Sequence, residues 1–257
     1  MNLNITIIFH NYVILLVNYK KERKMYNRDY LSNQSSQYAQ ESSQVQLMSF
    51  LKATYQLFAG SLLAATAGAY IGLGIVSILM GPVKWVLFAI ELGLIFFVIP
   101  RVKHTPGVNL AVLFAFTFIT GLTIAPLLAS IFAMPSGASI VGQAFLMTSV
   151  AFGGISMFAM TTKRDFSSMG KFLFIALIIM IVAGISNIFI QSSMMQLAIA
   201  SVGALLFSAF ILYDTQNIIK GQYDSPIEAS LALYLDFFNL FISLLQILGI
   251  MNSGDKE

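Results

Sequence analysis

The stretch from Phe172 to Ile190, FLFIALIIMIVAGISNIFI, decides the class of fold to which this chain belongs. It contains no charged residue, and its apolar residues follow one another without the alternation of a half-buried strand. A bilayer core about 30 Å thick requires roughly 20 such residues in a helix. We therefore expect a transmembrane helix here.

The composition of the whole chain is that of an integral membrane protein. Of its 257 residues, 58% are hydrophobic and 10% are charged, whereas about 25% of the residues in a soluble domain are charged. Apolar runs of about 20 residues also argue against a porin-type barrel, whose strands alternate. The absence of cysteine excludes disulfides, thiolate catalysis and zinc–thiolate sites. The net charge of +3 does not indicate a nucleic-acid partner, and we expect no cofactor.

Seven segments are long and apolar enough to cross the membrane. The gaps between them are short, so we expect one all-α, seven-helix bundle of antiparallel neighbours without a soluble domain. The second segment is the shortest and ends before Pro100, which we interpret as a helix stop or kink. The segments are Ala53–Ile78, Val83–Ile99, Val108–Leu128, Ala138–Met160, Phe172–Ile190, Leu197–Ile219 and Ile227–Ile250.

The N-terminal residues differ from the rest of the chain. Leu3–Val17 is apolar but short, and the basic cluster Lys20–Lys24 follows it, whereas a secretory signal has its charges first. We interpret Met25 as the true start of the protein; an interfacial helix before it is the alternative. The expected organisation is a doubtful leader (residues 1–24), a disordered polar tail (25–49), the membrane domain (50–250) and a short C-terminal tail (251–257).

Basic residues in the expected loops indicate the orientation in the membrane. With the N-terminus in the cytoplasm, and counting from Met25, eight Lys and Arg residues lie on the cytoplasmic side and two lie outside. Positive charge is enriched in cytoplasmic loops, so we expect a cytoplasmic N-terminus and, after seven spans, an external C-terminus. The eight are Arg28, Lys52, Arg101, Lys103, Lys163, Arg164, Lys171 and Lys220, and the two are Lys84 and Lys256.

Ionisable side chains inside a span are costly and are the first candidates for function. The clear cases are Glu91, Asp214 and Asp236. The two aspartates lie eleven residues before and after Ser225 in a predicted hairpin, so they have similar depth. If both face the interior, they share one proton, because two carboxylates in contact cannot both ionise at low cost. The alternative is that each bonds separately to other polar groups.

Arg101 follows Glu91 by ten residues, nearly three helical turns, so we expect both on roughly one face of the second span. Arg101 is either part of the functional site or an interfacial side chain whose charge reaches the membrane surface.

Two aspartates on adjacent spans also occur in intramembrane aspartyl proteases. Tyr213-Asp214 matches the first half of that signature, but no Gly-x-Gly precedes Asp236, and Ala125-Pro126-Leu127 has the wrong order for the Pro-Ala-Leu element. A serine protease of the membrane needs an embedded His or Lys beside a serine, and the spans contain no such pair. We therefore do not expect an enzyme, which leaves an ion pathway or a regulator that binds other membrane proteins.

Three runs in the last two spans carry a family resemblance: Leu212–Gln216 (LYDTQ), Leu233–Phe241 (LYLDFFNLF) and Leu244–Gly249 (LLQILG). Together with Phe50–Tyr55 (FLKATY) and Glu91, they resemble the signature of the Bax inhibitor-1 (transmembrane Bax inhibitor motif) family, in particular its bacterial members. The resemblance covers about residues 47–249.

This resemblance implies a bundle whose last helix is central, and a pH-sensitive calcium leak. In the family, the aspartates matching Asp214 and Asp236 form a proton-sharing pair that closes the cytoplasmic side. Arg101 matches an arginine that competes for the first of them in the open state. A second latch joins the glutamate matching Glu91 to a late arginine, whose position holds Gln246 in this chain.

We therefore expect a multipass protein of the bacterial inner (plasma) membrane that leaks cations, above all calcium, with calcium, protons and lipid as its partners. Asp214 and Asp236, with Tyr213, Asn239 or water, would form only a weak calcium site, as permeation requires. Bacterial relatives are also tied to the control of a membrane-bound ATP-dependent protease. A non-conducting regulator of such a protease is the alternative.

Overall fold

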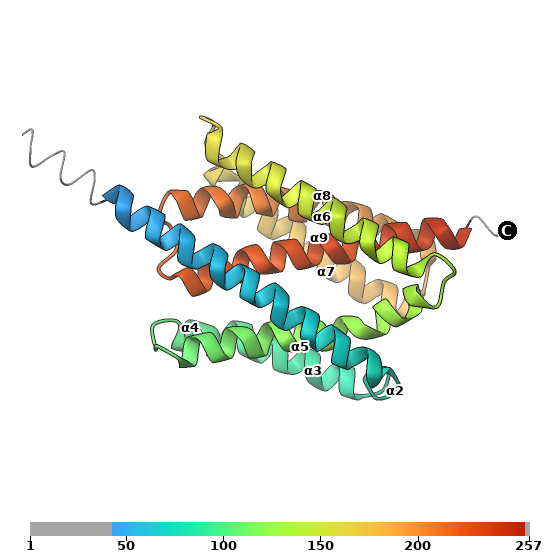
Figure 1. Cartoon of the computed structure of the whole chain (residues 1–257). Coiled ribbons are helices and arrows are strands. Elements are labelled where there is room, and N and C mark those ends of the chain that lie inside the picture. The colour runs from blue at the N-terminus through green and yellow to red at the C-terminus, as the bar shows by residue number, and fades with distance from the viewer. Residues whose placement is uncertain (1–42, 255–257) are drawn as a thin grey trace, which may run out of the picture. The chain divides into compact units, whose positions relative to one another are not determined.

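The computed structural model describes residues 43–254, which form no strand and contain seven helices long and apolar enough to cross a membrane (Figure 1). The prediction of an all-α protein with seven spans is confirmed. In chain order these are the first helix (Ser43–Gly74), the second span (Val83–Val102), α5 (Val108–Phe132), α6 (Gly137–Thr161), η2 with α7 (Ser167–Met169 and Gly170–Ile190), α8 (Ser193–Ile219) and α9 (Pro226–Gly254).

The ends of the first and last helices differ from the sequence prediction. Residues 43–49, the first that the structure describes, are already helical although they belong to the segment expected to be disordered; they contain no Pro or Gly that would interrupt a helix. The first helix ends at Gly74, before the short helix α2 (Val76–Leu79). α9 extends to Gly254, into the expected C-terminal tail. The expectations for the leader and for Met25 lie outside the described residues.

The second span has an irregular middle. It consists of α3 (Val83–Gly93), the π-helical segment η1 (Leu94–Val98) and α4 (Ile99–Val102). Of the two sequence interpretations of Pro100, a stop or a kink, the stop is wrong, because the span continues to Val102 with Pro100 in the first turn of α4. A proline in the first turn of a helical segment is tolerated, because its missing N–H would otherwise need a partner. The irregular turn therefore lets the span continue through the proline.

Two glycines bring the first helix and α5 into close contact. A Cβ atom on Gly68 would lie 2.0 Å from the carbonyl oxygen of Phe118, and one on Gly121 would lie 2.0 Å from that of Ala65. Small residues at such positions let the backbones of membrane helices approach each other closely. The contact depends on the absence of these two side chains.

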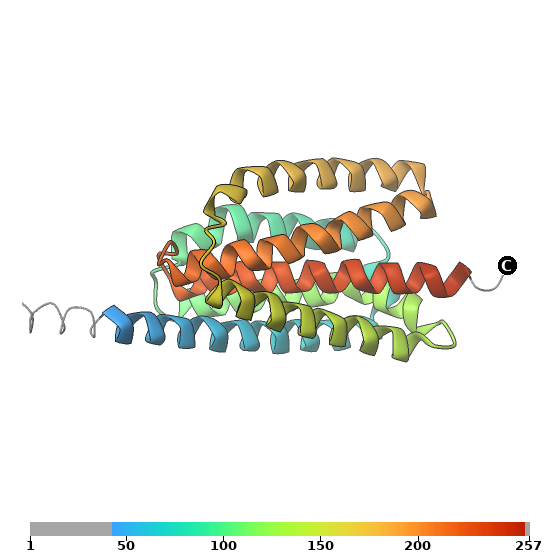
Figure 2. The ribbon, with the colours of Figure 1, turned by 90° about the horizontal axis from the view of Figure 1, so that it is seen from above.

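The last helix, α9, is the most buried of the seven spans. In its apolar stretch of 18 residues, 44% of the residues are buried inside the bundle. It packs against α8, α6 and α5 (Figures 1 and 2). The Phe237 ring lies edge-on to those of Phe58 and Phe152, with centroids 5.7 and 5.6 Å away. Such pairs contribute about 0.5–1.5 kcal/mol each beyond their buried area. A central last helix stays a prediction, which these contacts favour.

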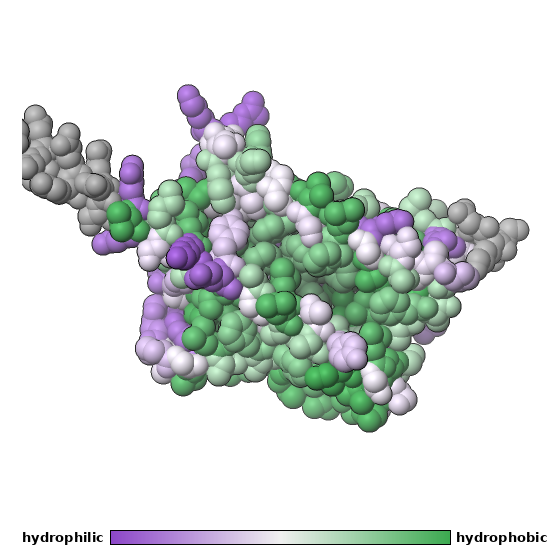
Figure 3. Space-filling view, viewed as in Figure 1, coloured by the Kyte–Doolittle hydropathy of each residue, from purple (hydrophilic) through white to green (hydrophobic). Residues whose placement is uncertain are grey.

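Large apolar side chains cover the outward faces of the helices. Phe189, Met194 and Leu205 are 82%, 84% and 75% exposed. The face in Figure 3 is mostly green, with purple residues gathered toward the ends. An apolar surface of this extent is unfavourable in water and matches the hydrocarbon core of a bilayer. The chain is therefore a multi-pass membrane protein.

Candidate functional site

The turn between α8 and α9, Lys220–Ser225, positions the two aspartates. α8 ends in a Schellman motif, in which the Gly221 N–H bonds to the Ile218 carbonyl at 3.1 Å. The Gln222 N–H bonds to the Asn217 carbonyl at 2.9 Å. Gly221 has a φ of +67°, which a residue without Cβ adopts readily. The chain therefore stops and reverses at this glycine.

A serine and a proline then start α9. The hydroxyl of Ser225 accepts a hydrogen bond from the Glu228 N–H at 3.3 Å, which caps the helix. Pro226 is the first helical residue, where its lack of an N–H costs nothing. The two helices thus leave the turn as antiparallel neighbours.

Asp214 of α8 and Asp236 of α9 meet inside the bundle. Their side chains are 8% and 5% exposed, and the two carboxyl groups are hydrogen-bond partners. The structure thus brings together the pair expected from equal distance to the turn. Oδ2 of Asp236 is buried and, within residues 43–254, has no N–H or hydroxyl donor. A proton shared with Asp214 is the simplest way to satisfy this oxygen.

Two neighbours of Asp214 were not expected from the sequence. The hydroxyl of Tyr223, in the turn, donates to Oδ1 of Asp214 at 2.8 Å. The side chain of Asn217, one turn along α8, also lies near Asp214, and its Oδ1 is buried without a partner in the described part of the chain. Asp214 therefore accepts from a hydroxyl donor, whereas Oδ2 of Asp236 has no such donor within residues 43–254.

The turn is tied to the second span by ion pairs. Lys103, directly after α4, lies 2.9 Å from Asp224 and 3.0 Å from Glu228. The hydrogen bonds to Asp224 and Glu228 raise the pKa of Lys103, and Lys103 lowers the pKa of Asp224. The end of the second span and the α8–α9 turn are therefore linked. We call this end of the bundle the turn end.

Arg101, the expected competitor for Asp214, lies elsewhere in this structure. It is exposed, its guanidinium bonds to the carbonyl of Phe97, and it lies over the Phe97 ring. Glu91 faces α5 instead, so the expectation that both share one face of the span is wrong. A π-helical turn takes up about one extra residue, which turns the following side chains by roughly 100°. Competition by Arg101 stays a prediction for another state.

Tyr213 and Asn239, suggested as additional calcium ligands, point to other neighbours. The hydroxyl of Tyr213 lies at the start of α7, against Gly170. The side-chain amide of Asn239 donates to the carbonyl of Leu235 in its own helix, at 2.8 Å. Neither is among the groups that contact the aspartate pair within residues 43–254.

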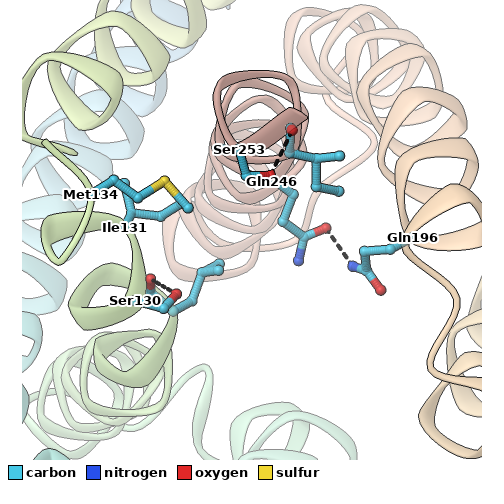
Figure 4. Close-up of a pocket in the computed structure, with 9 residues that line it drawn as sticks. Ser130, Ile131, Met134, Gln196, Gln246 and Ser253 are labelled. Carbon is cyan, nitrogen blue, oxygen red and sulfur yellow. Dashed lines mark hydrogen bonds between the residues drawn. The ribbon is translucent and has the colours of Figure 1, made fainter. Parts of the chain in front are cut away.

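Glu91 and Gln246, expected to form a second latch, have different partners. Thr123 of α5 donates to Glu91 at 2.9 Å. Gln246 accepts from Gln196 of α8 at 2.9 Å, and Gln196 accepts from Asn187 of α7 at 2.9 Å. Figure 4 shows the Gln196–Gln246 bond beside a pocket of about 250 Å³ between α5, α8 and α9. The latch stays a prediction.

The oxygens around the pair suit a weakly held cation better than a tightly bound metal. Within residues 43–254, no group of three or more His, Cys, Asp or Glu side chains could hold a metal ion. The available ligands are the two carboxyl groups, the orphaned Oδ1 of Asn217 and the hydroxyl of Tyr223. Calcium usually takes six to eight oxygens, so water would supply the rest. The calcium site stays a prediction.

Comparison with known proteins supplies the family. A family model described as "Inhibitor of apoptosis-promoting Bax1" matches residues 47–253. An uncharacterized protein of Campylobacter jejuni is 52% identical over 232 residues, covering 89% of this chain and 99% of that protein. An uncharacterized membrane protein of Vibrio cholerae is 42% identical, covering 80% and 91%. Mouse protein lifeguard 4 is 35% identical, covering 80% and 86%.

The matched region begins in the first helix and reaches the last turn of α9, so it includes all seven spans and the aspartate pair. Relatives of 35–52% identity run along most of its length. The resemblance noted in the last two spans is thereby confirmed, and the chain belongs to the Bax inhibitor-1 family.

Proposed function

We propose that this protein is a cation leak, with calcium as the main permeant ion, and that the Asp214–Asp236 pair closes it while the pair holds a proton. The hydrogen bond between two buried carboxyl groups on adjacent spans supports this proposal. Two carboxyl groups attract each other only when a proton lies between them. The protonated pair therefore draws α8 and α9 together.

Loss of the proton reverses this attraction. Two unit charges about 4 Å apart repel by roughly 4 kcal/mol at an effective dielectric constant of 20. That is comparable to the free energy that converts a two-state protein from mostly closed to mostly open. Separation of the helices, entry of water or binding of a cation relieves the repulsion, and each outcome favours opening. The leak therefore rises as pH increases.

Calcium uptake into liposomes that contain the purified protein, measured as a function of pH, tests the proposal. Uptake by the wild type should rise with pH. Asp236→Asn and Asp214→Asn should each flatten this response, because each removes the shared proton. Asp236→Asn should lean toward a constant leak, whereas Asp214→Asn should lean toward closure, because Asp214 is also the expected open-state partner of Arg101.

Asp165→Asn is a matched control. Asp165 is an exposed aspartate at the turn end that pairs with Lys220, and its substitution should leave the pH profile unchanged. If both Asp214→Asn and Asp236→Asn keep the wild-type profile, shared-proton gating is wrong for this protein.

We also propose that the protein lies in the bacterial inner membrane, with the turn end in the cytoplasm. The basic residues Lys103, Lys163 and Lys220 belong to the loops on that side of the predicted topology. Positive charge is retained on the cytoplasmic side of membrane proteins.

A non-conducting regulator of a membrane-bound ATP-dependent protease is the second candidate. The family description names an inhibitor, a role exerted on another protein. Neither candidate requires catalysis by this chain. Absence of calcium flux at every pH, together with co-purification of the protein with such a protease, would favour the regulator over the leak.

A further inference from the structure

Hydrogen-bond donors are distributed unequally around the aspartate pair. Asp214 accepts from the Tyr223 hydroxyl at 2.8 Å, and the side chain of Asn217 lies nearby. Oδ2 of Asp236 is buried and has no N–H or hydroxyl donor in the described part of the chain. Donors stabilise the ionised form of a carboxyl group, and a buried charge without them is costly. The shared proton therefore belongs on Asp236, with Asp214 as the ionised partner.

Tyr223 can donate only while its hydroxyl keeps its proton. Burial raises the pKa of Tyr223, and the neighbouring Asp214 raises it further. The charges of Asp236 in α9 and Tyr213 in α8 raise the pKa of Tyr223 as well. Tyr223 therefore remains a donor throughout the pH range in which the aspartates exchange a proton.

The segment that carries Tyr223 is held at the end of the second span. Lys103 pairs with Asp224, the next residue after the tyrosine, at 2.9 Å. It also pairs with Glu228, in the first turn of α9, at 3.0 Å. A displacement of the second span therefore pulls on the residues that position the tyrosine hydroxyl.

Building on the proposed function, we infer that Tyr223 is the third member of the pH sensor, a positioning residue whose hydroxyl keeps Asp214 ionised and the proton on Asp236. The ion pairs of Lys103 hold this hydroxyl in place. The α8–α9 turn thereby sets the pH at which the pair releases its proton, and the position of the second span adjusts that pH.

Infrared spectroscopy of the protonated carboxyl group, with the full-length protein in lipid vesicles, tests this inference as pH is varied. Asp236→Asn identifies the band of the pair, because it removes the shared proton. Tyr223→Phe keeps the ring and removes the donor. Asp214 carries less of the negative charge while it accepts the shared proton from Asp236 than after that proton has left, so the Tyr223 hydroxyl stabilises the doubly ionised pair more than the singly ionised one. Without this donor the pair should keep its proton to a higher pH, by about one unit. An unchanged midpoint overturns the inference. Tyr70→Phe is the matched control, since Tyr70 is 80% exposed on the first helix.

We call the ion pairs of Lys103 with Asp224 and Glu228 the tether. The substitution Lys103→Met tests it in the wild-type protein and in the Tyr223→Phe variant. Loss of the ion pairs frees the turn, so the midpoint should move in the same direction as in Tyr223→Phe, but less far. If Lys103 acts through the tyrosine, its substitution should cause no further shift in the Tyr223→Phe background. Equal shifts in both backgrounds would overturn the role of the tether. Lys84→Met, which removes a lysine that lies over the Trp85 ring instead, is the control.

Calcium flux, measured on the same vesicles, separates this inference from the proposed function. A wild type that shows the carboxyl titration without flux overturns the leak, and the shift in Tyr223→Phe still decides the role of Tyr223. A wild type without a titrating band that Asp236→Asn removes overturns the inference itself.

Discussion

At the scale of single residues, glycine marks where helices touch. The backbone carbonyl of Ala65 occupies the space that a Cβ on Gly121 would need, with the atoms only 2.0 Å apart. Gly153 of α6 is a useful contrast, because nothing lies within 4 Å of its added Cβ. The same methyl group should therefore have opposite effects at the two positions.

We expect Gly121→Ala to destabilise the protein by about 1–3 kcal/mol, because the first helix and α5 must separate to admit the methyl group. Gly153→Ala should be neutral or stabilising, by up to about 1 kcal/mol, because alanine loses less backbone entropy in a helix. Thermal unfolding in detergent measures both. Similar melting temperatures for the two variants would show that the close contact is not needed for stability.

The residues of the site differ in how visible they are in the sequence. Asp214 and Asp236 could be predicted, because charges within apolar spans are rare and the hairpin sets their depth. Asn217 follows Asp214 by three residues, a helical spacing that could have identified it as a neighbour. Tyr223 and Lys103 could not be predicted, because their contacts depend on how the turn folds back and on how two distant helices meet.

At the scale of elements, the second span shows why helical spacing alone misled. Ten residues in a regular α-helix make nearly three turns, which places Glu91 and Arg101 on similar faces. The π-helical segment η1 lies between them and takes up about one residue more, so they point in different directions. The sequence of η1, LIFFV, contains no residue that predicts a π-helical turn, because packing against other parts of the bundle decides this irregularity.

The tether between the second span and the turn should not itself respond to pH near neutrality. The lowered pKa of Asp224 keeps its carboxylate charged until the solution is acidic, so its stabilising effect is lost only as pH falls through that lowered value. The raised pKa of Lys103 keeps its charge until the solution is strongly basic, so its effect is lost only as pH rises through that value. The proposed pH response is therefore assigned to the aspartate pair and not to these ion pairs.

Distances between spin labels can test whether the tether stays intact as pH changes. The chain has no cysteine, so labels can be attached at His104→Cys and Gln222→Cys, two exposed positions beside the tether. We expect the distance distribution from double electron–electron resonance to stay narrow between about pH 5 and 9, the range between the ordinary pKa values of Asp and Lys. Lys103→Met should broaden it. A distribution that broadens with pH in the otherwise unchanged protein would contradict a constant tether.

At the scale of the whole molecule, the lengths of the apolar segments predicted the seven spans. Most of the observed helix ends lie within a few residues of the predicted ends. The helical conformation of residues 43–49 could not be predicted in this way, because a helix can continue beyond its apolar segment through polar residues. Orientation is a property of the whole chain, set by the balance of basic loops.

A reporter fused after Glu257 should therefore be non-cytoplasmic, and one inserted in the loop between Lys163 and Lys171 should be cytoplasmic, because an odd number of spans separates the termini and basic loops remain inside. Paired reporters that are active on opposite sides of the membrane measure this. A cytoplasmic reporter after Glu257 would contradict the proposed orientation.

The amides that join α7, α8 and α9 have a direction. The Ser192 N–H donates to Oδ1 of Asn187 at 3.1 Å, and because a backbone N–H cannot accept, this bond determines which end of every following amide is the donor. The side-chain N–H₂ group of Asn187 donates to the amide oxygen of Gln196, and the N–H₂ group of Gln196 donates to the amide oxygen of Gln246. The last member of the series is Gln246, whose N–H₂ group turns away from Gln196 in Figure 4. Three neutral dipoles aligned head to tail thus present partial positive charge where the family resemblance places an arginine. No change of pH near neutrality discharges it.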